Sequence, residues 1–423
     1  MQVLERIKED GIRFVNLQFS DILGVIKEII IPVKELENAL KKGVWFDGSS
    51  IEGFARIQES DMFLRPDPKT YTKIPWLEDT ARFICDVCGS SGKPFEGDPR
   101  SILKKTLSET RYDFKVGPEL EFYLFRQGEP VDESSYFEAP SEEGRKVLRE
   151  AISYLEGMGI DAEASHHEVG KGQYEIDVKY DSALRIADSV MTSKYVVKAV
   201  AQKYGLKATF MPKPIFGAPG SGMHVHQSLF EGEENLFYDE RDRYNLSRLA
   251  YHFIAGQMEH IKAMCAVVSP TVNSYKRLIS GFEAPVYITW ARMNRSALIR
   301  VPKWFDEKSA RIELRCPDPS CNPYLAFTVM LAAGLDGIKK KLEPPEPVEE
   351  NIYALNEEDR KYKHIDTLPS SLHEALIELE KDEVIQKALG GLHRRYVEIK
   401  RREWNEFKFQ VTSWELEKYM GMY

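Results

Sequence analysis

Two acidic residues stand two positions apart inside a stretch that otherwise has the composition of a buried strand. Glu119 and Glu121 alternate with three apolar residues, Leu120, Phe122 and Leu124. Successive side chains of an extended chain point to opposite faces, so the two glutamates share one face. Carboxylates held together among aromatic residues lose hydration and repel each other, and they need a counter-charge to stay ionised. A divalent cation would supply that charge, although an exposed strand with two solvated glutamates fits this stretch equally well.

A second acidic stretch, residues 165–175 with the sequence SHHEVGKGQYE, has Glu168 and Glu175 on either side of a glycine-containing turn. A turn of this kind can bring both carboxylates to one point. Polar surface hairpins commonly have the same composition, so this stretch taken alone is more often a surface hairpin than a site.

A glycine-rich loop, residues 216–222, leads into a strand-like run with His224, His226 and Ser228 on one face. Glycine lets a ligand approach the backbone closely, and imidazole beside carboxylates is a common ligand of divalent metals. A single histidine is more often structural. A glycine-rich loop that leads into His-x-His-x-Ser is a much more specific indication of a site.

Arginines form the next chemical group. Four of them lie among apolar residues rather than in a run of charges: Arg277, Arg292, Arg295 and Arg300. Guanidinium groups in such settings usually pair with carboxylate or phosphate. A strand-like run at residues 310–316 places Arg311, Glu313 and Arg315 on one face, although salt-bridged surface strands look similar.

Together these stretches supply ligands for two divalent ions, namely Glu119, Glu121, Glu168, Glu175, Glu313 and His224. Oxygen-rich ligand sets suit Mg²⁺ or Mn²⁺ better than zinc. Two such cations, arginines and a glycine-rich loop are the working parts of phosphoryl transfer, where positioning and charge neutralisation do most of the catalysis. The residues alone therefore predict an ATP- and metal-dependent transferase or ligase.

Composition restricts the class of protein. The chain has 423 residues, 43% of them hydrophobic, which is enough for two or three domains with large cores. Its net charge of −9 argues against a nucleic-acid surface. The N-terminus lacks an apolar signal core, and the longest apolar run, residues 324–335, is shorter than a bilayer span. We therefore expect a cytoplasmic protein that binds neither nucleic acid nor membrane.

The five cysteines are an odd number, which does not fit a disulfide framework. Cys85 and Cys88 have the spacing of a pair of zinc ligands, but the second pair that such a site needs does not follow at a suitable distance. We expect all five to be buried thiols.

The elements that must position these residues change character along the chain. Two strand-like runs and a turn in residues 12–31 predict a hairpin, followed by a short helix over residues 33–42. The polar segment 89–99, rich in glycine and proline, is the expected domain boundary. Beyond it the spacing of apolar residues predicts longer helices over residues 142–157, 182–204, 371–390 and 391–408. Asn322-Pro323 is a favourable helix start.

The motifs, taken in order, resemble type I glutamine synthetases over essentially the whole chain. They are FDGSSI at 46–51, ESD at 59–61, GPELEF at 117–122, HHE at 166–168, GQYE at 172–175, GSGMH at 220–224, NSYKR at 273–277, GFEAP at 281–285, NRS at 294–296 and RIELR at 311–315. The resemblance implies an α+β fold. A small β-grasp-like domain would occupy residues 1–98. A catalytic domain at 99–423 would have a curved, mainly antiparallel sheet flanked by helices, with a helical C-terminal region.

The reaction implied by this resemblance is the ATP-dependent condensation of L-glutamate with ammonium through a γ-glutamyl phosphate. Two or more Mg²⁺ or Mn²⁺ ions would assist it. The ion on the glutamate side would be held by Glu121, Glu168 and Glu175. The ion beside the ATP phosphates would be held by Glu119, His224 and Glu313.

The resemblance also assigns the arginines. Arg295 and Arg300 would stabilise the transferring phosphoryl group, and Arg277 and Arg315 would bind the carboxylates of glutamate. Other residues that fall where the family binds glutamate or ammonium are Ser50, Tyr136 and Gly220. Those that fall where it binds the nucleotide are Glu163, Val178, Lys179, Tyr180, His226, Ser228, Arg300 and Arg311.

Asp47 and Glu283 match the acids that collect ammonium and remove its proton, a task that needs carboxylates near the metal but not on it. Glu283 lies on a loop that could close over the site and keep water from the acyl phosphate. The family builds its sites between subunits, so Asp47 would come from a neighbour. The resemblance therefore implies a homododecamer of two stacked hexameric rings.

Three departures from the family pattern matter. Pro219 stands where the family usually has an asparagine before the Gly-Ser-Gly of the loop, which implies a backbone role there. Tyr353 lies near a tyrosine that is nucleotidylated in some members, but its surroundings differ, so we expect no modification. The short chain fits the subgroup regulated by feedback inhibition, in which Arg56 has the implicated position.

Three other functions remain open to test. One is a related γ-glutamyl ligase that uses a polyamine or another amine, although Asp47 and Glu283 favour ammonium. Another is a non-catalytic relative that keeps the ring, which the complete set of ligands and arginines argues against. A nucleotide-independent metallohydrolase would leave the arginines unexplained.

Overall fold

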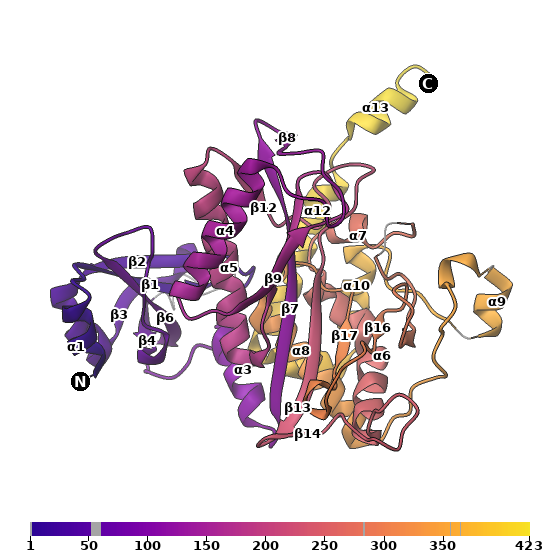
Figure 1. The fold of residues 1–423 in the computed structure, drawn as a ribbon, viewed down its shortest axis with the longest axis horizontal. Coiled ribbons are helices and arrows are strands. Elements are labelled where there is room, and N and C mark those ends of the chain that lie inside the picture. Colours follow the sequence, from indigo (N-terminus) through magenta and orange to yellow (C-terminus); the bar gives the residue numbers. More distant parts are fainter. Residues whose placement is uncertain (1, 52–60, 282–283, 356, 364) are drawn as a thin grey trace.

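The computed structural model describes residues 2–51, 61–281, 284–355, 357–363 and 365–423. The chain forms a six-stranded sheet near the N-terminus and an eleven-stranded sheet beyond it. Figure 1 shows the small sheet at one side of the molecule and the long strands of the large sheet at its centre. Each sheet buries its own group of apolar side chains, and the two groups share no residue.

The small sheet has the order β2-β1-β6-β4-β3, with β5 paired to β6. Its strands are β1 (Phe14–Ser20), β2 (Ile26–Pro32), β3 (Val44–Asp47), β4 (Asp61–Pro66), β5 (Thr72–Lys73) and β6 (Thr80–Gly89), and its helices are α1 (Gln2–Glu9) and α2 (Leu36–Lys42). β1 and β2 form the antiparallel hairpin predicted for residues 12–31. β1 also pairs in parallel with β6, and both strands contribute to a core shared with α1 and α2.

The large sheet has the order β15-β16-β17-β13-β7-β10-β9. These strands are β7 (Asp113–Arg126), β9 (Ala162–His167), β10 (Gln173–Val178), β13 (Met223–Glu231), β15 (Trp290–Ala291), β16 (Ile299–Arg300) and β17 (Ile312–Leu314). Four short strands pair with the two central strands: β8 (Glu129–Pro130), β11 (Asp181–Ser182) and β12 (Lys207–Thr209) pair with β7, and β14 (Glu234–Asn235) pairs with β13. Every pairing except that of β15 with β16 is antiparallel.

Helices cover the apolar face of the large sheet. They are α3 (Pro99–Ser108), α4 (Glu142–Gly157), α5 (Ala183–Lys203), α6 (Arg248–Val268) and α8 (Pro323–Lys340), and a single-turn helix, α7 (Ser274–Arg277), follows α6. The helices predicted over 142–157 and 182–204 are confirmed as α4 and α5. α8 begins as predicted, because the Asn322 side chain accepts a hydrogen bond from the Tyr324 amide and proline follows at the first helical position.

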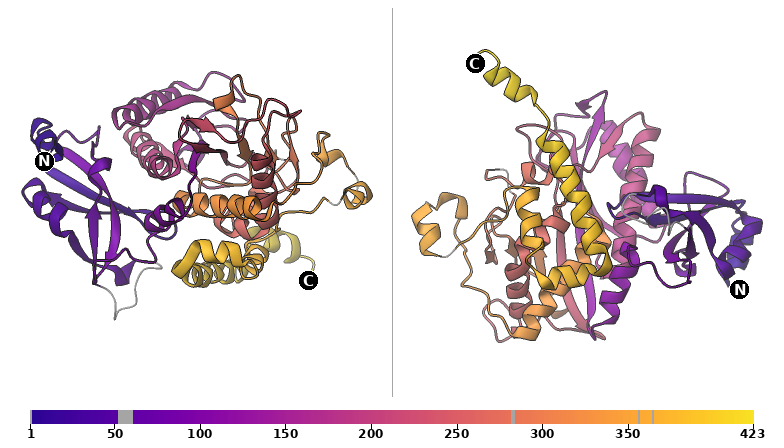
Figure 2. Two further views of the ribbon diagram at one scale, coloured as in Figure 1. Left: turned by 90° about the horizontal axis from the view of Figure 1, so that it is seen from below. Right: turned by 180° about the vertical axis from the view of Figure 1, so that it is seen from behind.

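The C-terminal region is helical but more broken than predicted. It consists of α9 (Glu357–Tyr362), α10 (Leu372–Leu379), α11 (Glu383–Leu389), α12 (His393–Lys408) and α13 (Ser413–Tyr419). A single helix over residues 371–390 was wrong, because the Asp382 side chain accepts hydrogen bonds from the Val384 and Ile385 amides and so starts a new helix. Figure 2 shows α13 extending away from the body of the molecule.

Two further expectations concern the cysteines and the lengths of the helices. All five cysteines are free and buried, as predicted. Within the described ranges, every helix is too short or too polar to cross a membrane.

Candidate active site

The register of the large sheet sets its charged residues in two cross-strand rows. One row runs from His166 on β9 to Glu175 on β10 and Glu121 on β7. The other runs from Asp177 on β10 to Glu119 on β7 and His224 on β13. Because Glu119 and Glu121 are two residues apart, both rows lie on one face of β7, as predicted. Leu120, Phe122 and Leu124 on the other face are fully buried.

The first cluster of possible metal ligands consists of Glu119, His224 and Glu313, whose ligand atoms all lie within 4.8 Å of one another. His224 Nδ1 is 2.9 Å from Glu119 Oε2 and 3.7 Å from Glu313 Oε1. His226 Nε2 is 2.7 Å from the other Glu119 oxygen. The cluster was predicted from the sequence, and three neighbouring strands bring it together.

Opposing effects act on the charges of this first cluster. Burial disfavours the ionised carboxyl of Glu119, but its hydrogen bonds with His224 and His226 hold the pKa well below its ordinary value. Burial likewise opposes ionisation of Glu313, and the charges of His226 and Arg315 lower its pKa. Burial lowers the pKa of His224, which favours the neutral imidazole that binds metals.

The second cluster consists of His166, Glu168 and Glu175, again with ligand atoms within 4.8 Å of one another. His166 Nε2 is 3.1 Å from Glu168 Oε1 and 3.8 Å from Glu175 Oε1. The sequence predicted Glu168 and Glu175 here but not His166. The HHE motif contains it, but only the pairing of β9 with β10 shows that this histidine, rather than His167, faces the acids.

Glu121 lies beside the second cluster rather than within it. One of its oxygens accepts hydrogen bonds from the Gly222 amide at 2.8 Å and from Gln173 Nε2 at 3.1 Å. Burial, together with the charge of Glu168, raises its pKa to about 8. Burial and the charge of Glu121 raise the pKa of Glu175 well above its ordinary value. These carboxyl groups lack sufficient positive charge around them, and their oxygens suit hard divalent cations.

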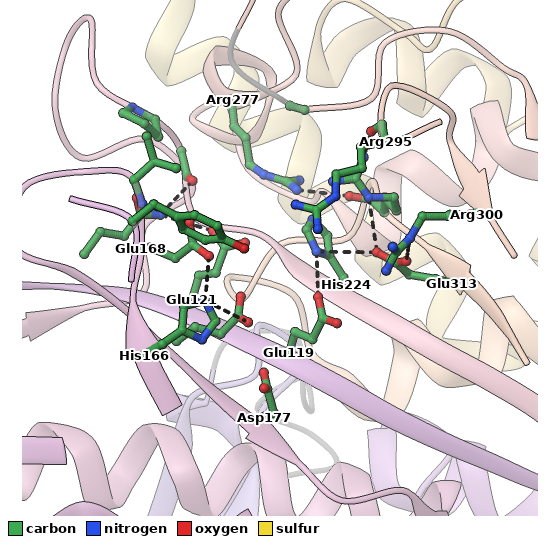
Figure 3. A pocket seen from close by; sticks show the side chains of 18 of the residues that line it. Glu119, Glu121, His166, Glu168, Asp177, His224, Arg277, Arg295, Arg300 and Glu313 are labelled. Atoms are coloured by element: carbon green, nitrogen blue, oxygen red, sulfur yellow. Dashed lines mark hydrogen bonds and ion pairs between the residues drawn. The ribbon is translucent and has the colours of Figure 1, made fainter. Parts of the chain in front are cut away.

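Arginines border both clusters (Figure 3). The buried guanidinium of Arg277 donates to the carbonyls of Arg315, Cys316 and Pro317 at 3.0, 2.7 and 3.2 Å. Glu313 accepts from Arg315 Nε at 3.1 Å and also from Arg300 Nε. Arg277 is thus held by the backbone, whereas Arg300 and Arg315 are held by a carboxylate of the first cluster.

The ligands of both clusters, Glu121 and these arginines line a hollow of about 530 Å³. Tyr136, Gly220, Ala284 and Arg295 also line it. A second hollow of about 310 Å³ adjoins it, and Glu119 and Asp177 border both. Six of the residues predicted to bind the nucleotide line the second hollow: Glu163, Val178, Tyr180, His226, Ser228 and Arg311. Arg300 lines the first hollow instead, and Lys179 lines neither.

Besides Lys179, four other predicted residues contribute no described side chain to the hollows. Asp47 ends β3 in the small sheet, where its side chain accepts from the Ser49 amide, and it lines neither hollow. Ser50 lies in the turn that follows. Arg56 and Glu283 lie outside the described residues.

Family models match two parts of the chain. The glutamine synthetase catalytic domain matches residues 96–419, and the glutamine synthetase beta-grasp domain matches residues 11–90. The chain belongs to the glutamine synthetase family. This membership confirms the predicted α+β fold with its N-terminal β-grasp unit. It also confirms the prediction of an ATP-dependent ligase that joins ammonia to L-glutamate.

Other members of the family match over the full length. The glutamine synthetases of Methanocaldococcus jannaschii and Staphylococcus aureus are 50% and 49% identical to the chain, covering 99% and 98% of it and 97% of each relative. Among solved structures, a GmaS/ADP complex has a TM-score of 0.92 at 33% identity, covering 99% of both chains. The glutamine synthetase of Plasmodium falciparum has a TM-score of 0.90 at 26% identity, covering 99% of this chain and 98% of its own.

Proposed function

We propose that the chain forms glutamine through a γ-glutamyl phosphate in the larger hollow, with Mg²⁺ or Mn²⁺ held at both acidic clusters. Glu119 and Glu121, two residues apart on β7, each belong to one cross-strand row of ionisable residues. The two rows bring two ligand clusters and a set of arginines to one cavity, and this observation carries the proposal. Bound there, the cations would neutralise phosphate charge and polarise the reacting oxygens. Their ligands would be Glu119, His224 and Glu313 in the first cluster, and Glu168 and Glu175 with Glu121 or His166 in the second.

ATP would occupy the smaller hollow, with its phosphates directed toward Glu119. Two arrangements support this placement. Glu119 borders both hollows, so a nucleotide in one can present its terminal phosphate to the other. Arg311 and Lys115 line the smaller hollow, and each offers a positive charge to an anion. Arg300 and Arg295 border the larger hollow, where they would stabilise the phosphoryl group during transfer.

Glutamate would bind in the larger hollow beside the second cluster. Arg277 is buried and held by three carbonyls, which fixes its guanidinium at the wall of the hollow. Together with Arg315 it would bind the substrate's carboxylates. Tyr136 and Gly220 line the same wall. The Pro219 carbonyl accepts from the Tyr123 hydroxyl at 2.8 Å, which agrees with a backbone role at that position.

Ammonium would be captured by Asp47 of a neighbouring subunit and deprotonated by Glu283. The absence of Asp47 from the described lining of its own hollows supports a contribution in trans. Large apolar side chains are exposed along the C-terminal segment 409–423, which supports assembly into an oligomer, for which we propose two stacked hexamers. Arg56 would serve feedback inhibition. The Tyr353 hydroxyl donates to the Ala284 carbonyl, which supports the proposal that it is not modified.

The assay that tests the proposal compares ammonium with other amines, because a γ-glutamyl ligase that uses a polyamine or another amine is the rival function. Purified protein would receive glutamate, MgATP and ammonium, with putrescine or ethanolamine replacing ammonium in parallel reactions. We expect ADP release that depends on ammonium. Turnover only with an amine would select the alternative, and no turnover with ammonium would refute the proposal.

Glu283→Ala tests the step after activation. We expect it to impair ammonium-dependent glutamine formation more than formation of the acyl phosphate, because a base is needed only when ammonium attacks. Trapping the acyl phosphate with hydroxylamine while measuring glutamine separates the two steps. Equal loss of both would contradict the role assigned to Glu283.

A further inference from the structure

Asp132 is a buried carboxylate outside both clusters, in the segment between β8 and α4 that also carries Tyr136. Only 7% of its side chain is exposed. Oδ1 accepts from His167 Nε2 at 2.8 Å and from the Gly172 amide at 3.0 Å. Oδ2 accepts from the Ser141 amide at 3.2 Å and from the Tyr174 hydroxyl. Four donors thus converge on one carboxylate.

Three of these donors, from His167, Gly172 and Tyr174, belong to the β9–β10 hairpin that carries the second cluster. His167 directly precedes Glu168, and its Nδ1 contacts the Glu168 carbonyl at 2.6 Å. Tyr174 directly precedes Glu175 on β10. The ring of His167 meets that of Tyr174 edge-on, with centroids 4.8 Å apart. Asp132 therefore ties the end of β9, which Glu168 directly follows, to β10, which carries Glu175.

The same network includes the segment that leads to Tyr136. The Phe137 amide donates to the His167 carbonyl at 3.0 Å, and Tyr136 itself lines the larger hollow. A side chain at Gly172 would lie 3.0 Å from the Val131 amide, so the hairpin and this segment pack closely. The position of Tyr136 is thus coupled to the position of the acids.

The acids of the second cluster repel one another, and their convergence must be imposed by the backbone. A carboxylate suits that purpose here because it accepts at both oxygens. An amide in its place would keep one oxygen and would direct two N–H groups at donors. Asp132→Asn therefore changes the network while it preserves the shape of the side chain.

We propose that Asp132 is a positioning residue, which holds the β9–β10 hairpin and the Tyr136 segment so that His166, Glu168 and Glu175 converge on a divalent cation. The inference rests on the proposed function of that cluster as a cation site. Asp132 itself touches neither the cation nor the substrate. Partners that orient metal ligands typically affect affinity by about 10–100-fold when removed.

Binding of Mn²⁺ to the full-length protein, followed by electron paramagnetic resonance, tests this inference. Glu168→Gln and His224→Asn first assign the two classes of site, because each variant should weaken one class. Asp132→Asn should then weaken Mn²⁺ binding about 10–100-fold at the class assigned by Glu168→Gln and leave the other class unchanged. The KM for glutamate should rise while the KM for ATP stays the same.

Asp242→Asn is the matched control. Asp242 accepts from the Tyr244 and Leu246 amides at 2.8 and 3.2 Å and from the Tyr251 hydroxyl at 2.8 Å, outside both hollows. It should lower the melting temperature without changing either class of Mn²⁺ site. If Asp132→Asn does not fold, Tyr174→Phe removes one donor to Asp132 and should weaken the same class to a smaller degree.

Three results would overturn the inference. One is that Asp132→Asn leaves the Mn²⁺ affinity of both classes of site unchanged. Another is that it weakens Mn²⁺ binding equally at both classes of site. The same weakening in Asp242→Asn would attribute the effect to stability alone. A wild-type protein that binds no Mn²⁺ would instead refute the proposed cation site itself, so the two failures are distinguishable.

Discussion

At Gly222 the backbone passes between three ionisable side chains of the site. A β-carbon added there would lie 2.5 Å from Arg277 Nη2, 3.0 Å from His224 Nε2 and 3.2 Å from Glu121 Oε1. Arg277 cannot move aside cheaply because three carbonyls hold its guanidinium. We expect Gly222→Ala to reduce kcat/KM about 100-fold, since small displacements of positioned groups have effects of that order.

Steady-state kinetics and thermal unfolding together check this prediction. Gly157→Ala is the control, because Gly157 ends α4 and a β-carbon there would meet nothing within 4 Å. That control should keep full activity. Wild-type kinetics in Gly222→Ala would mean that the site accommodates the methyl group and that its charged residues are less tightly positioned.

At the scale of residues, sequence patterns predicted which side chains face the site but not how they group. Alternation along β7 correctly placed Glu119 and Glu121 on one face. It could not show that Glu121 would bond to Gln173 and Gly222, leaving His166 nearer to Glu168 and Glu175. Such groupings depend on the register between strands distant in sequence, which no local pattern contains.

The contact between α6 and the C-terminal helices centres on His260. Its Nε2 lies 2.9 Å from Asp336 of α8, and its Nδ1 lies 2.6 Å from Asp382 at the start of α11. Lys340 also pairs with Asp336, at 2.7 Å, and Glu259 adds a negative charge near Lys340. Burial disfavours the charged imidazole, but the hydrogen bonds to Asp382 and Asp336 outweigh it and raise the pKa of His260 above 6.5.

Because the folded state binds this proton more tightly, the stabilisation is complete below the unfolded pKa of about 6.5 and is lost as pH rises through the higher folded pKa. We expect His260→Gln to lower the unfolding temperature most near pH 6 and progressively less toward pH 9. Thermal unfolding at a series of pH values measures this difference. A pH-independent difference for His260→Gln would contradict the prediction.

At the scale of elements, local signals predicted helix starts better than helix continuity. Asn322-Pro323 predicted the start of α8 correctly. The apolar spacing over residues 371–390 suggested one helix, because α10 and α11 both turn apolar residues toward α6 and α8. The break follows from the capping bonds of Asp382, and the same aspartate contacts His260. The position of the break therefore reflects packing between helices as well as the local preference of aspartate for helix starts.

Arg100, on α3, joins the small sheet to the helices of the large domain. Its buried guanidinium pairs with Asp67 at 3.0 Å and Asp86 at 2.7 Å in the small sheet, and with Asp188 of α5 at 2.9 Å. Arg100→Met would remove the guanidinium that pairs with Asp188, while Lys104 would still pair with Asp86 at 2.6 Å and with Asp67 at 3.8 Å. Loss of one partner from a buried ion pair costs about 3–5 kcal/mol, and we expect destabilisation of that order.

Urea unfolding measures this change, with Arg185→Met as the control. Arg185 lies on α5, the helix that carries Asp188, but it forms an exposed pair with Asp181 at 3.2 Å. Exposed pairs contribute at most about 1 kcal/mol. Similar destabilisation by both variants would show that Arg100 does not unite the two parts of the molecule.

We propose that each site is completed by a neighbouring subunit. Asp47 lies in the small sheet and lines neither hollow of its own chain, so we expect it to act at the site of a neighbouring subunit. Asp47→Ala and Glu168→Gln subunits would each be inactive alone. Mixed in equal amounts before assembly, they would leave about one quarter of the sites with both residues intact if each site spans two subunits.

Activity of co-expressed, differently tagged subunits, purified through both tags, checks this prediction. Recovery toward one quarter of the wild-type rate would support contribution in trans, because neither parent chain can supply both residues by itself. Sites confined to one chain would show no recovery, since every subunit lacks either Asp47 or Glu168. Mixing the two variants after separate assembly should also give no recovery, which distinguishes sites shared within an oligomer from exchange of product between oligomers.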